Sequence, residues 1–218
     1  MFWRFGFHAC SAIDTLLDKP DVTLEEILGE DDLLQECKAH NTKLIEYLRD
    51  PNILAKLLNY IIADEQVDDK AKFKLLYLLP WCWLLCRYSY VSCEVLSCEI
   101  WSICETVVQN RDLLLNFWKF LDRPSPLNPL QASYFTKVNE QFLEKKTDEV
   151  IGVTTWFADC LQMIPFIQSI PNIVPKLLRH IETSAIMDLL LKIISMEKTE
   201  PGSGIVEAST LVSLLLIC

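Results

Sequence analysis

The sequence predicts an all-α fold built from helical repeats. Apolar residues recur at helical rather than strand-like spacing in stretches of about ten to twenty residues. Prolines and short connections separate these stretches, and only five glycines occur in 218 residues. Such helices are typical of an α-solenoid of the armadillo or HEAT type, although no clean repeat period is visible. Hydrophobic residues make up 51% of the chain, which is ample for a core.

The first predicted helix begins after Thr23. Thr23 and Glu26 have the spacing of a capping box, in which each side chain accepts a hydrogen bond from the backbone of the other residue. Gly29 is expected to end this helix in a left-handed conformation. The apolar residues that the helix would bury are Leu24, Ile27 and Leu28.

A second helix is expected to begin at Asp31 and Asp32, because carboxylates favour the positive end of a helix dipole. It is predicted to continue to Leu48, although Asn41 interrupts its apolar side. That side consists of Leu33, Leu34, Cys37, Leu44, Ile45 and Leu48.

Proline marks the start of two later helices. Asp50 before Pro51 predicts an N-cap followed by proline at the first helical position. Its buried face would hold Ile53, Leu54, Leu57, Leu58, Ile61 and Ile62. Asn128 before Pro129 repeats this pattern and predicts a helix to about Lys145.

Between and beyond these helices the pattern is less regular. The charged residues 64–74 are predicted to form a connector, and residues 90–121 a long helical stretch that breaks near Asn110. Thr183 or Ser184 is expected to cap a last helix. Its inward face would hold Ile186, Leu189, Leu190, Ile193 and Ile194.

Five blocks of sequence, in the same order as in the family, resemble the SAPS-domain proteins. The blocks are MFWRF at 1–5, IDTLL at 13–17, VTLEEILGEDDLLQECKAHNTKL at 22–44, SPLNPLQASYFTKV at 125–138 and HIETSAIMDLLLK at 180–192. SAPS-domain proteins are regulatory subunits of the protein phosphatase 6 class of serine/threonine phosphatase. The resemblance implies a helical-repeat scaffold that binds a phosphatase catalytic subunit and influences which substrates the phosphatase meets. It also allows further adaptor proteins as partners.

Three apolar segments depart from the family pattern: residues 75–87, about 152–164, and the tail 206–218. Residues 1–205 are therefore interpreted as the N-terminal part of a SAPS-like domain, and the solenoid as incomplete. The segments are either insertions that thicken the core or residues translated from unspliced sequence, and we favour the second. Because its leucines and tryptophans lie all round any helix, residues 75–87 are expected to lie outside the well-packed fold. Glu182 stands where the family has glycine, which puts the turn before Thr183 in question.

The acidic N-terminal region holds the first candidate interaction surface. The net charge is −10, and nine acidic residues lie between positions 14 and 36 against a single lysine. Asp31, Asp32 and Glu36 are candidates for docking a basic patch on a phosphatase or adaptor. The alternative is that they form only the solvated side of a helix pair.

The loop of residues 125–130 holds the second candidate surface. Prolines fix a loop in one conformation and so lower the entropy lost when it contacts a partner. Pro126, Asn128 and Pro129 are therefore candidate contact residues, and the alternative is that the loop only stops one helix and starts another.

The sequence predicts no enzyme activity and no cofactor. The scarcity of glycine argues against the Rossmann, P-loop and nucleophile-elbow enzymes. Neighbouring carboxylates such as Asp31 and Asp32 point about 100° apart on a helix, and no nucleophile or histidine motif accompanies them. A regulatory subunit is therefore favoured over a structural adaptor that binds no phosphatase and over a small hydrolase.

The nine cysteines predict neither disulfides nor a metal site. Cys82 and Cys86 are four positions apart, and Cys93, Cys98 and Cys104 follow at intervals of five and six, so no CxxC pair is present in this group. Free cysteine behaves as a small apolar residue. Buried, reduced thiols are therefore expected.

Charge and segment length exclude two further partners. The excess of acidic residues argues against binding of a nucleic-acid backbone. The apolar run at 75–86 would span roughly 18 Å as a helix, against about 30 Å for a membrane core. No secretory signal opens the chain. We therefore predict no nucleic acid and no membrane as partners, and a location in the cytoplasm with the nucleus as a further location.

Overall fold

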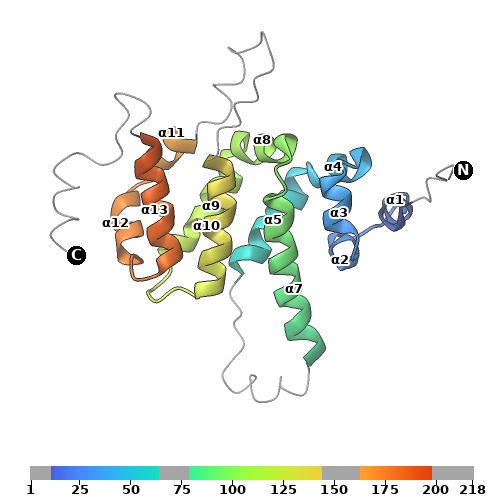
Figure 1. Ribbon diagram of the computed structural model, residues 1–218, viewed down its shortest axis with the longest axis horizontal. Helices are drawn as coiled ribbons and strands as arrows, with labels where there is room; N and C mark the ends of the chain where they lie inside the picture. Colours follow the sequence, from blue (N-terminus) through green and yellow to red (C-terminus); the bar gives the residue numbers. More distant parts are fainter. Residues whose placement is uncertain (1–10, 64–78, 144–162, 198–218) are drawn as a thin grey trace, which may run out of the picture.

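The computed structural model describes residues 11–63, 79–143 and 163–197, except for the side chains of residues 79–86 and 196–197. Every regular element in these ranges is a helix (Figure 1). The elements are α1 Ala12–Leu17, α2 Leu24–Gly29, α3 Leu33–Lys38, α4 Thr42–Leu48, α5 Pro51–Ile62, α7 Leu79–Leu96, α8 Trp101–Gln109, α9 Arg111–Trp118, the 3-10 helix η1 Lys119–Asp122, α10 Pro129–Leu143, α11 Met163–Gln168, α12 Ile173–Arg179 and α13 Ser184–Glu197.

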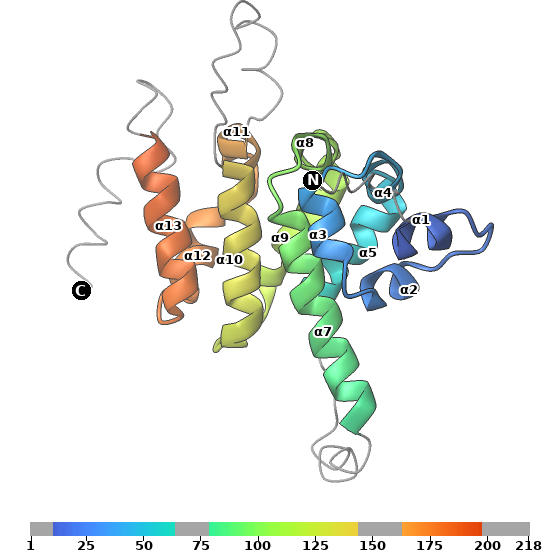
Figure 2. The same cartoon turned by 45° about the vertical axis from the view of Figure 1, so that its right-hand side comes forward.

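The longer helices form two layers. Helices α7, α10 and α13 lie side by side, and α10 packs against both of its neighbours (Figures 1 and 2). The second layer runs from α5 through α9 and η1 to α12, and α5 packs against α7 and α12 against α13. The short helices α1 to α4 lie at the end of this row next to α5 and α7. This arrangement confirms the predicted all-α, helical-repeat fold.

An aromatic cluster fills the core between the two layers. Phe135 of α10 is fully buried, and its ring centroid lies 4.8 Å from that of Phe117, 5.4 Å from that of Trp118 and 5.1 Å from that of Phe120. Trp118 also contacts Phe166 of α11 edge-on at 6.4 Å. The residues after α9 continue as η1, which directs Phe120 inward with Phe117 and Trp118. These rings hold α9, η1, α10 and α11 together.

Three predicted helix starts are confirmed by their hydrogen bonds. The Thr23 hydroxyl accepts from the Glu26 amide at 3.3 Å, and Glu26 accepts from the Thr23 amide at 3.0 Å. Asp50 accepts from two amides in the first turn of α5. Asn128 accepts from the amides of Leu130 and Gln131 at 3.0 and 3.3 Å. The last helix begins at Ser184, directly after Thr183, whose carbonyl accepts from two amides of α13.

The region 21–48 departs from the prediction at two points. Gly29 is the last residue of α2 and has no positive φ, and Glu30 ends the helix in an extended conformation with φ −75° and ψ 133°. The predicted left-handed cap is therefore wrong. The single helix expected from Asp31 to Leu48 is two helices, because His40 has a φ of 56° and Asn41 caps the new helix α4.

The predicted break near Asn110 is confirmed, because α8 ends at Gln109 and α9 begins at Arg111. Two other features were not predicted. The first is an earlier break, where α7 ends at Leu96 and Glu99 has a φ of 55° before α8. The second is the position of two prolines. Helices α11 and α12 each contain a proline at the third position. The first turn of a helix tolerates proline because its amides have no partner within the helix.

Arg87, the last residue of the apolar segment 75–87, contacts the described fold. Helix α7 is continuous from Leu79 to Leu96, and the Arg87 side chain, 24% exposed, bonds to the turn before α3. Arg87 is therefore part of the packed fold. The expectation that residues 75–86 lie outside the packed fold depends on side chains that are not among the described residues. The predicted connector 64–74 and the tail 206–218 also lie outside the described residues. Within the described ranges, no helix has the length and apolar character needed to cross a membrane.

Candidate functional site

Asp31 lies in the turn between α2 and α3 and points into solvent. Its side chain is 93% exposed, and its Oδ1 accepts a hydrogen bond from Arg87 Nη2 at 2.8 Å. The same guanidinium nitrogen donates to the carbonyl oxygen of Gly29 at 2.7 Å. Because solvent surrounds the Asp31 carboxylate, it screens the ion pair with the partly buried Arg87. Asp31 is therefore exposed, and its role in docking stays a prediction.

Asp32 is exposed at the N-cap position of α3, with a φ of −84° and a ψ of −2°. Its side chain makes no capping hydrogen bond. The carboxylate still lies near the positive end of the α3 dipole. Asp32 is thus exposed and makes no capping contact.

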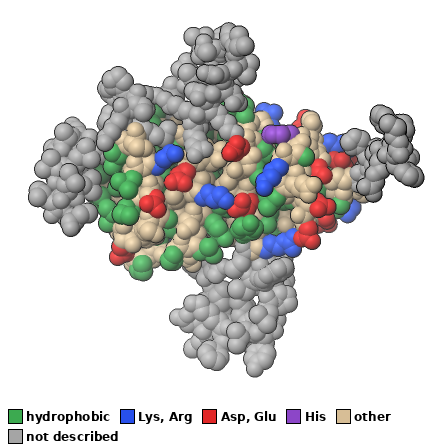
Figure 3. All heavy atoms as spheres, in the orientation of Figure 1, with side chains coloured by type: hydrophobic (Ala, Val, Ile, Leu, Met, Phe, Trp, Pro, Cys, Tyr) green, Lys and Arg blue, Asp and Glu red, His purple; other side chains and the backbone are tan. Residues whose placement is uncertain are grey.

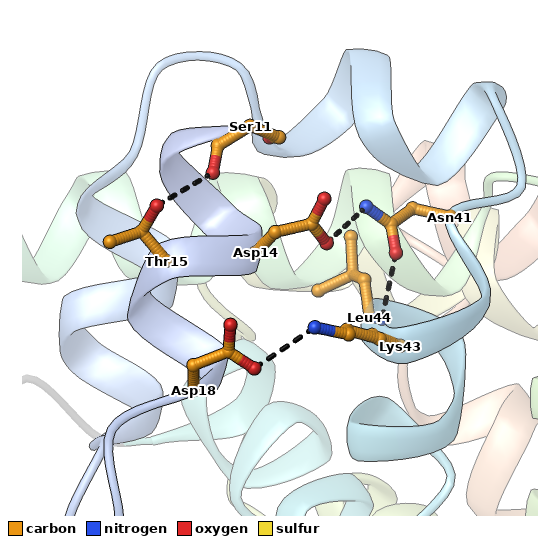
Figure 4. Close-up of polar contacts among 7 residues, drawn as sticks. All are labelled: Ser11, Asp14, Thr15, Asp18, Asn41, Lys43 and Leu44. Carbon is orange, nitrogen blue, oxygen red and sulfur yellow. Dashed lines mark hydrogen bonds and ion pairs between the residues drawn. The ribbon is translucent and has the colours of Figure 1, made fainter. Parts of the chain in front are cut away.

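Glu36 has a structural partner. It accepts a hydrogen bond from Asn41 Nδ2 at 2.8 Å, and the same nitrogen donates to Asp14 Oδ1 of α1 at 3.0 Å. Asn41 Oδ1 accepts from the Leu44 amide at 3.2 Å, which caps α4 (Figure 4). Lys43 pairs with Asp18 at 2.9 Å beside this network. Glu36 therefore helps to join α1, α3 and α4, and its role in docking stays a prediction.

Glu25, a further carboxylate of the acidic region, is bonded to α5. Its Oε1 accepts a short hydrogen bond from the Tyr60 hydroxyl. This bond lowers the pKa of Glu25, because the charged carboxylate is the better acceptor. Burial, and next the hydrogen bond to Glu25, raise the pKa of Tyr60. Sequence reasoning missed this pair because the two residues are 35 positions apart.

Replacing Tyr60 with phenylalanine is expected to raise the pKa of Glu25 towards its ordinary value of 4.5. A carboxyl group with a lowered folded-state pKa stabilises the fold above its unfolded-state pKa, and this contribution is lost as the pH falls through the folded-state pKa. The variant should therefore lose less stability than the parent chain on acidification below pH 4.5. Side-chain NMR titration of Glu25 checks the shift directly.

Tyr47→Phe is the matched control. Tyr47 lies near Glu25 and burial raises its pKa, but its hydroxyl is not the donor that lowers the pKa of Glu25. An equal change of the Glu25 titration in both variants would show that the Tyr60 hydrogen bond is not the cause.

The second predicted surface, the loop of residues 125–130, is anchored at several points. Leu127 is buried, Asn128 caps α10, and the Ser125 hydroxyl donates to the Glu182 carboxylate. Pro126 and Pro129 are exposed, and the Ser125–Pro126 peptide is cis. The exposed prolines remain candidate contact residues.

The turn before Thr183 accommodates Glu182 without backbone strain, because Glu182 has no positive φ.

The two predicted surfaces lie on different parts of the molecule. Asp31, Asp32 and Glu36 belong to α3 and the turn before it, among the short helices α1 to α4 (Figure 1). Residues 125–130 lie after η1 and include the first two residues of α10. Figure 3 shows several acidic side chains over the right-hand end of this face, where Figure 1 places the short helices. Basic side chains lie among them. Within the described ranges, no group of three or more His, Cys, Asp or Glu residues could hold a metal ion.

Two comparisons agree with the resemblance of the five sequence blocks. A family model described as SAPS, SIT4 phosphatase-associated protein, matches residues 157–216. Over 213 residues the chain is 47% identical to Extragenic suppressor of kinetochore protein 1 of Schizosaccharomyces pombe, which covers 95% of this chain and 23% of that protein. The chain belongs to the SAPS family.

Other relatives of this SAPS-family chain carry the names of phosphatase subunits. Serine/threonine-protein phosphatase 6 regulatory subunit 3 of Gallus gallus is 37% identical over 204 residues, which are 92% of this chain and 20% of that protein. Regulatory subunit 2 of Homo sapiens is 36% identical over 195 residues, 89% of this chain and 18% of that protein. The chain thus spans about a fifth of the length of these relatives. No solved structure matches it.

The residues matched by the SAPS family model overlap two of the three apolar segments. Residues 157–216 include parts of the second and third segments that were interpreted as departures from the family. The division of the chain at residue 205 stays a prediction.

Proposed function

We propose that this chain forms part of a non-catalytic regulatory subunit that binds a catalytic subunit of the phosphatase 6 class and influences which substrates it meets. The observation that carries the proposal is the 37% identity over 204 residues to a protein named as a regulatory subunit of phosphatase 6. The two-layered helical fold supports it, because stacked helices offer extended surfaces for protein partners. The location in the cytoplasm remains a prediction.

Asp31 and Asp32 are proposed to guide the approach of a basic partner. Both carboxylates are exposed at the end of the molecule that carries the acidic helices. Exposed charges act mainly on the rate at which partners meet and less on the stability of the complex. This surface therefore affects association more than dissociation.

Co-purification with a recombinant phosphatase 6 class catalytic subunit tests the proposed function. The immobilised chain is expected to retain the catalytic subunit, and the isolated chain to release no phosphate from a phosphopeptide. The region of the Schizosaccharomyces pombe relative that matches this chain serves as a parallel sample. Retention by that region but not by this chain would contradict the proposal. Turnover of the phosphopeptide that a single substitution in this chain abolishes would contradict a non-catalytic role.

Replacing Asp31 and Asp32 together with asparagine is expected to slow association about two- to tenfold at low salt and to flatten its dependence on salt. The matched control replaces Asp112 and Asp188, exposed residues of α9 and α13, and so removes the same charge elsewhere. Stopped-flow or surface-binding kinetics at several salt concentrations distinguish the two. Equal rates for both double variants would mean that the acidic surface does not steer the partner. Glu36→Gln is measured separately, because Glu36 also bonds Asn41.

A further inference from the structure

A shallow groove lies where α1, α4 and α5 meet. Its volume is about 500 Å³. Helix α4 packs against both α1 and α5, so the packing of these helices holds the walls of the groove in place. The described residues that line it are Leu17 of α1, Lys43, Glu46 and Tyr47 of α4, Asp50 before α5, and Ile53 of α5. These residues do not include the acidic candidates Asp31, Asp32 and Glu36.

Three of the lining residues give the groove an apolar surface. Leu17, Tyr47 and Ile53 pack against the hydrophobic core, and each of them is also partly exposed to solvent. Apolar side chains in a preformed hollow gain free energy when a partner covers them. The groove can therefore take up an apolar side chain from outside the fold.

The other lining residues make the edge of the groove negative. Glu46 and Asp50 are exposed, and neither forms an ion pair with a described residue. The Lys43 ammonium pairs with Asp18 at 2.9 Å, which balances its positive charge. The charges left without a counterpart in the lining are thus those of two carboxylates.

Further carboxylates lie near the Tyr47 side chain. Burial, and next three negative charges, raise the pKa of Tyr47. The charges are those of Glu25, Asp50 and Glu26. Because Glu25 and Glu26 belong to α2, a further helix adds negative charge to this region.

We propose that this groove, called here the Tyr47 groove, binds a short segment of a partner protein in which arginine adjoins an apolar residue. The apolar side chain lies against Leu17, Tyr47 and Ile53, and the guanidinium group bonds to Glu46 and Asp50. This inference goes beyond the proposed function, because it does not require the partner to be a phosphatase.

The free oxygen of Asp50 fits this role. Asp50 caps α5 by accepting from the amides of Asn52 at 2.7 Å and Ile53 at 3.4 Å, and both bonds use Oδ1. Its Oδ2 can therefore accept from a guanidinium group while the cap stays intact. Glu46 makes no capping contact, so both of its oxygens can take part.

Charge and shape favour such a segment over other ligands. Negative carboxylates repel the phosphate groups of nucleotides and nucleic acids. The planar guanidinium group of arginine bonds to a carboxylate through two parallel hydrogen bonds, and it also stacks on aromatic rings such as that of Tyr47. A segment with basic residues alone would leave the apolar surface of the groove uncovered.

The test adds the capped peptide Gly-Arg-Leu-Arg-Gly to the intact 218-residue chain, isotope-labelled in the methyl groups of leucine and isoleucine. NMR is expected to show saturable shifts of the methyl signals of Leu17 and Ile53. The signals of Leu113, which lines a different groove between α5 and α9, should not move. The absence of saturable shifts at Leu17 and Ile53 would overturn the proposal.

Two control peptides separate the groove from attraction by charge alone. Gly-Arg-Gly-Arg-Gly keeps the positive charges but lacks the apolar side chain, and Gly-Glu-Leu-Glu-Gly keeps the apolar side chain but reverses the charges. Each is expected to bind at least about tenfold more weakly, since burial of a leucine and pairing of the charges each account for such a factor. Equal binding of Gly-Arg-Gly-Arg-Gly would contradict the proposal.

Glu46→Lys is expected to weaken the binding of Gly-Arg-Leu-Arg-Gly about five- to tenfold. Asp188→Lys makes the same change of charge at an exposed residue of α13 and should alter the affinity by less than about twofold, because salt screens distant charges. Equal weakening in both variants would show that net charge, and not the groove, governs binding. Titration of the parent chain needs no substitution, so it decides the matter even where a variant does not fold.

Two other occupants of the groove would give different results. Shifts of the Leu17 and Ile53 signals on dilution, without peptide, would assign the groove to a second copy of the chain. The same shifts after removal of residues 2–10, in a chain with unchanged circular dichroism, would assign it to those residues. Either result would overturn the proposal. Retention of the phosphatase catalytic subunit is measured separately, so the proposed function can fail or hold independently.

Discussion

Replacing Phe135 with alanine is expected to lower the free energy of unfolding by about 3–5 kcal/mol, the usual cost of removing a buried phenylalanine. Phe135 is fully buried, and its ring lies within 5.4 Å of the rings of Phe117, Trp118 and Phe120. The substitution would leave a cavity between the two helix layers. Equilibrium unfolding in urea measures the loss.

Two controls separate this cavity from general effects on α10. Phe135→Leu keeps an apolar side chain and should cost less than Phe135→Ala. Leu130→Ala changes a residue of the same helix that is 52% exposed, and it should change the stability by no more than about 0.5 kcal/mol. A cost below about 1 kcal/mol for Phe135→Ala would show that the aromatic cluster does not hold the layers together.

Replacing Asn41 with alanine is expected to lower the free energy of unfolding by about 2–4 kcal/mol. The loss of an N-cap costs about 1 kcal/mol, and the two hydrogen bonds to part-buried carboxylates are expected to contribute about 1–3 kcal/mol together, because solvent screens them. Asn41 caps α4 and also donates to the carboxylates of Asp14 and Glu36. The variant should therefore loosen three helices at once, which urea unfolding and hydrogen exchange of α1, α3 and α4 would show.

Asn128→Ala provides the comparison for the cap alone. Asn128 caps α10 through two backbone amides, and we expect its loss to cost about 1 kcal/mol. Asn41→Asp keeps the capping oxygen but places a third carboxylate beside Asp14 and Glu36, so it should also destabilise the fold, and less so at acidic pH. Equal losses for Asn41→Ala and Asn128→Ala would mean that the bonds to Asp14 and Glu36 contribute nothing.

Helix starts were predictable because their signals are local. The Thr23–Glu26 box, Asp50 with Pro51, and Asn128 with Pro129 each involve residues within three positions of one another. The break between α3 and α4 was not predictable in this way. The apolar residues on both sides of Asn41 keep one helical spacing, and the hydrogen bond to Asp14, 27 positions away, is visible only in the fold.

The acidic residues could be located from the sequence, but the distant residues that they contact could not. Asp31 contacts Arg87 across 56 positions, and Glu25 contacts Tyr60 across 35 positions. Spacing rules for single helices cannot bring such residues together, since they describe only neighbours within about four positions. The layered architecture was predicted partly from the family resemblance, because no clean repeat period marks it in the sequence.

The contacts that Asn41 makes fix the positions of three helices without changing the charge of this region. An amide, which carries no charge, holds the carboxylates of Asp14 and Glu36 in place, so their negative charges are positioned without being neutralised. Salt weakens exposed ion pairs such as Lys43–Asp18, but it acts far less on hydrogen bonds from a neutral donor in a part-buried site. This end of the molecule can therefore keep its shape over a wide range of ionic strength while the reach of its electric field changes. A partner that approaches it would meet the same surface at every salt concentration, and only the speed of the encounter would differ.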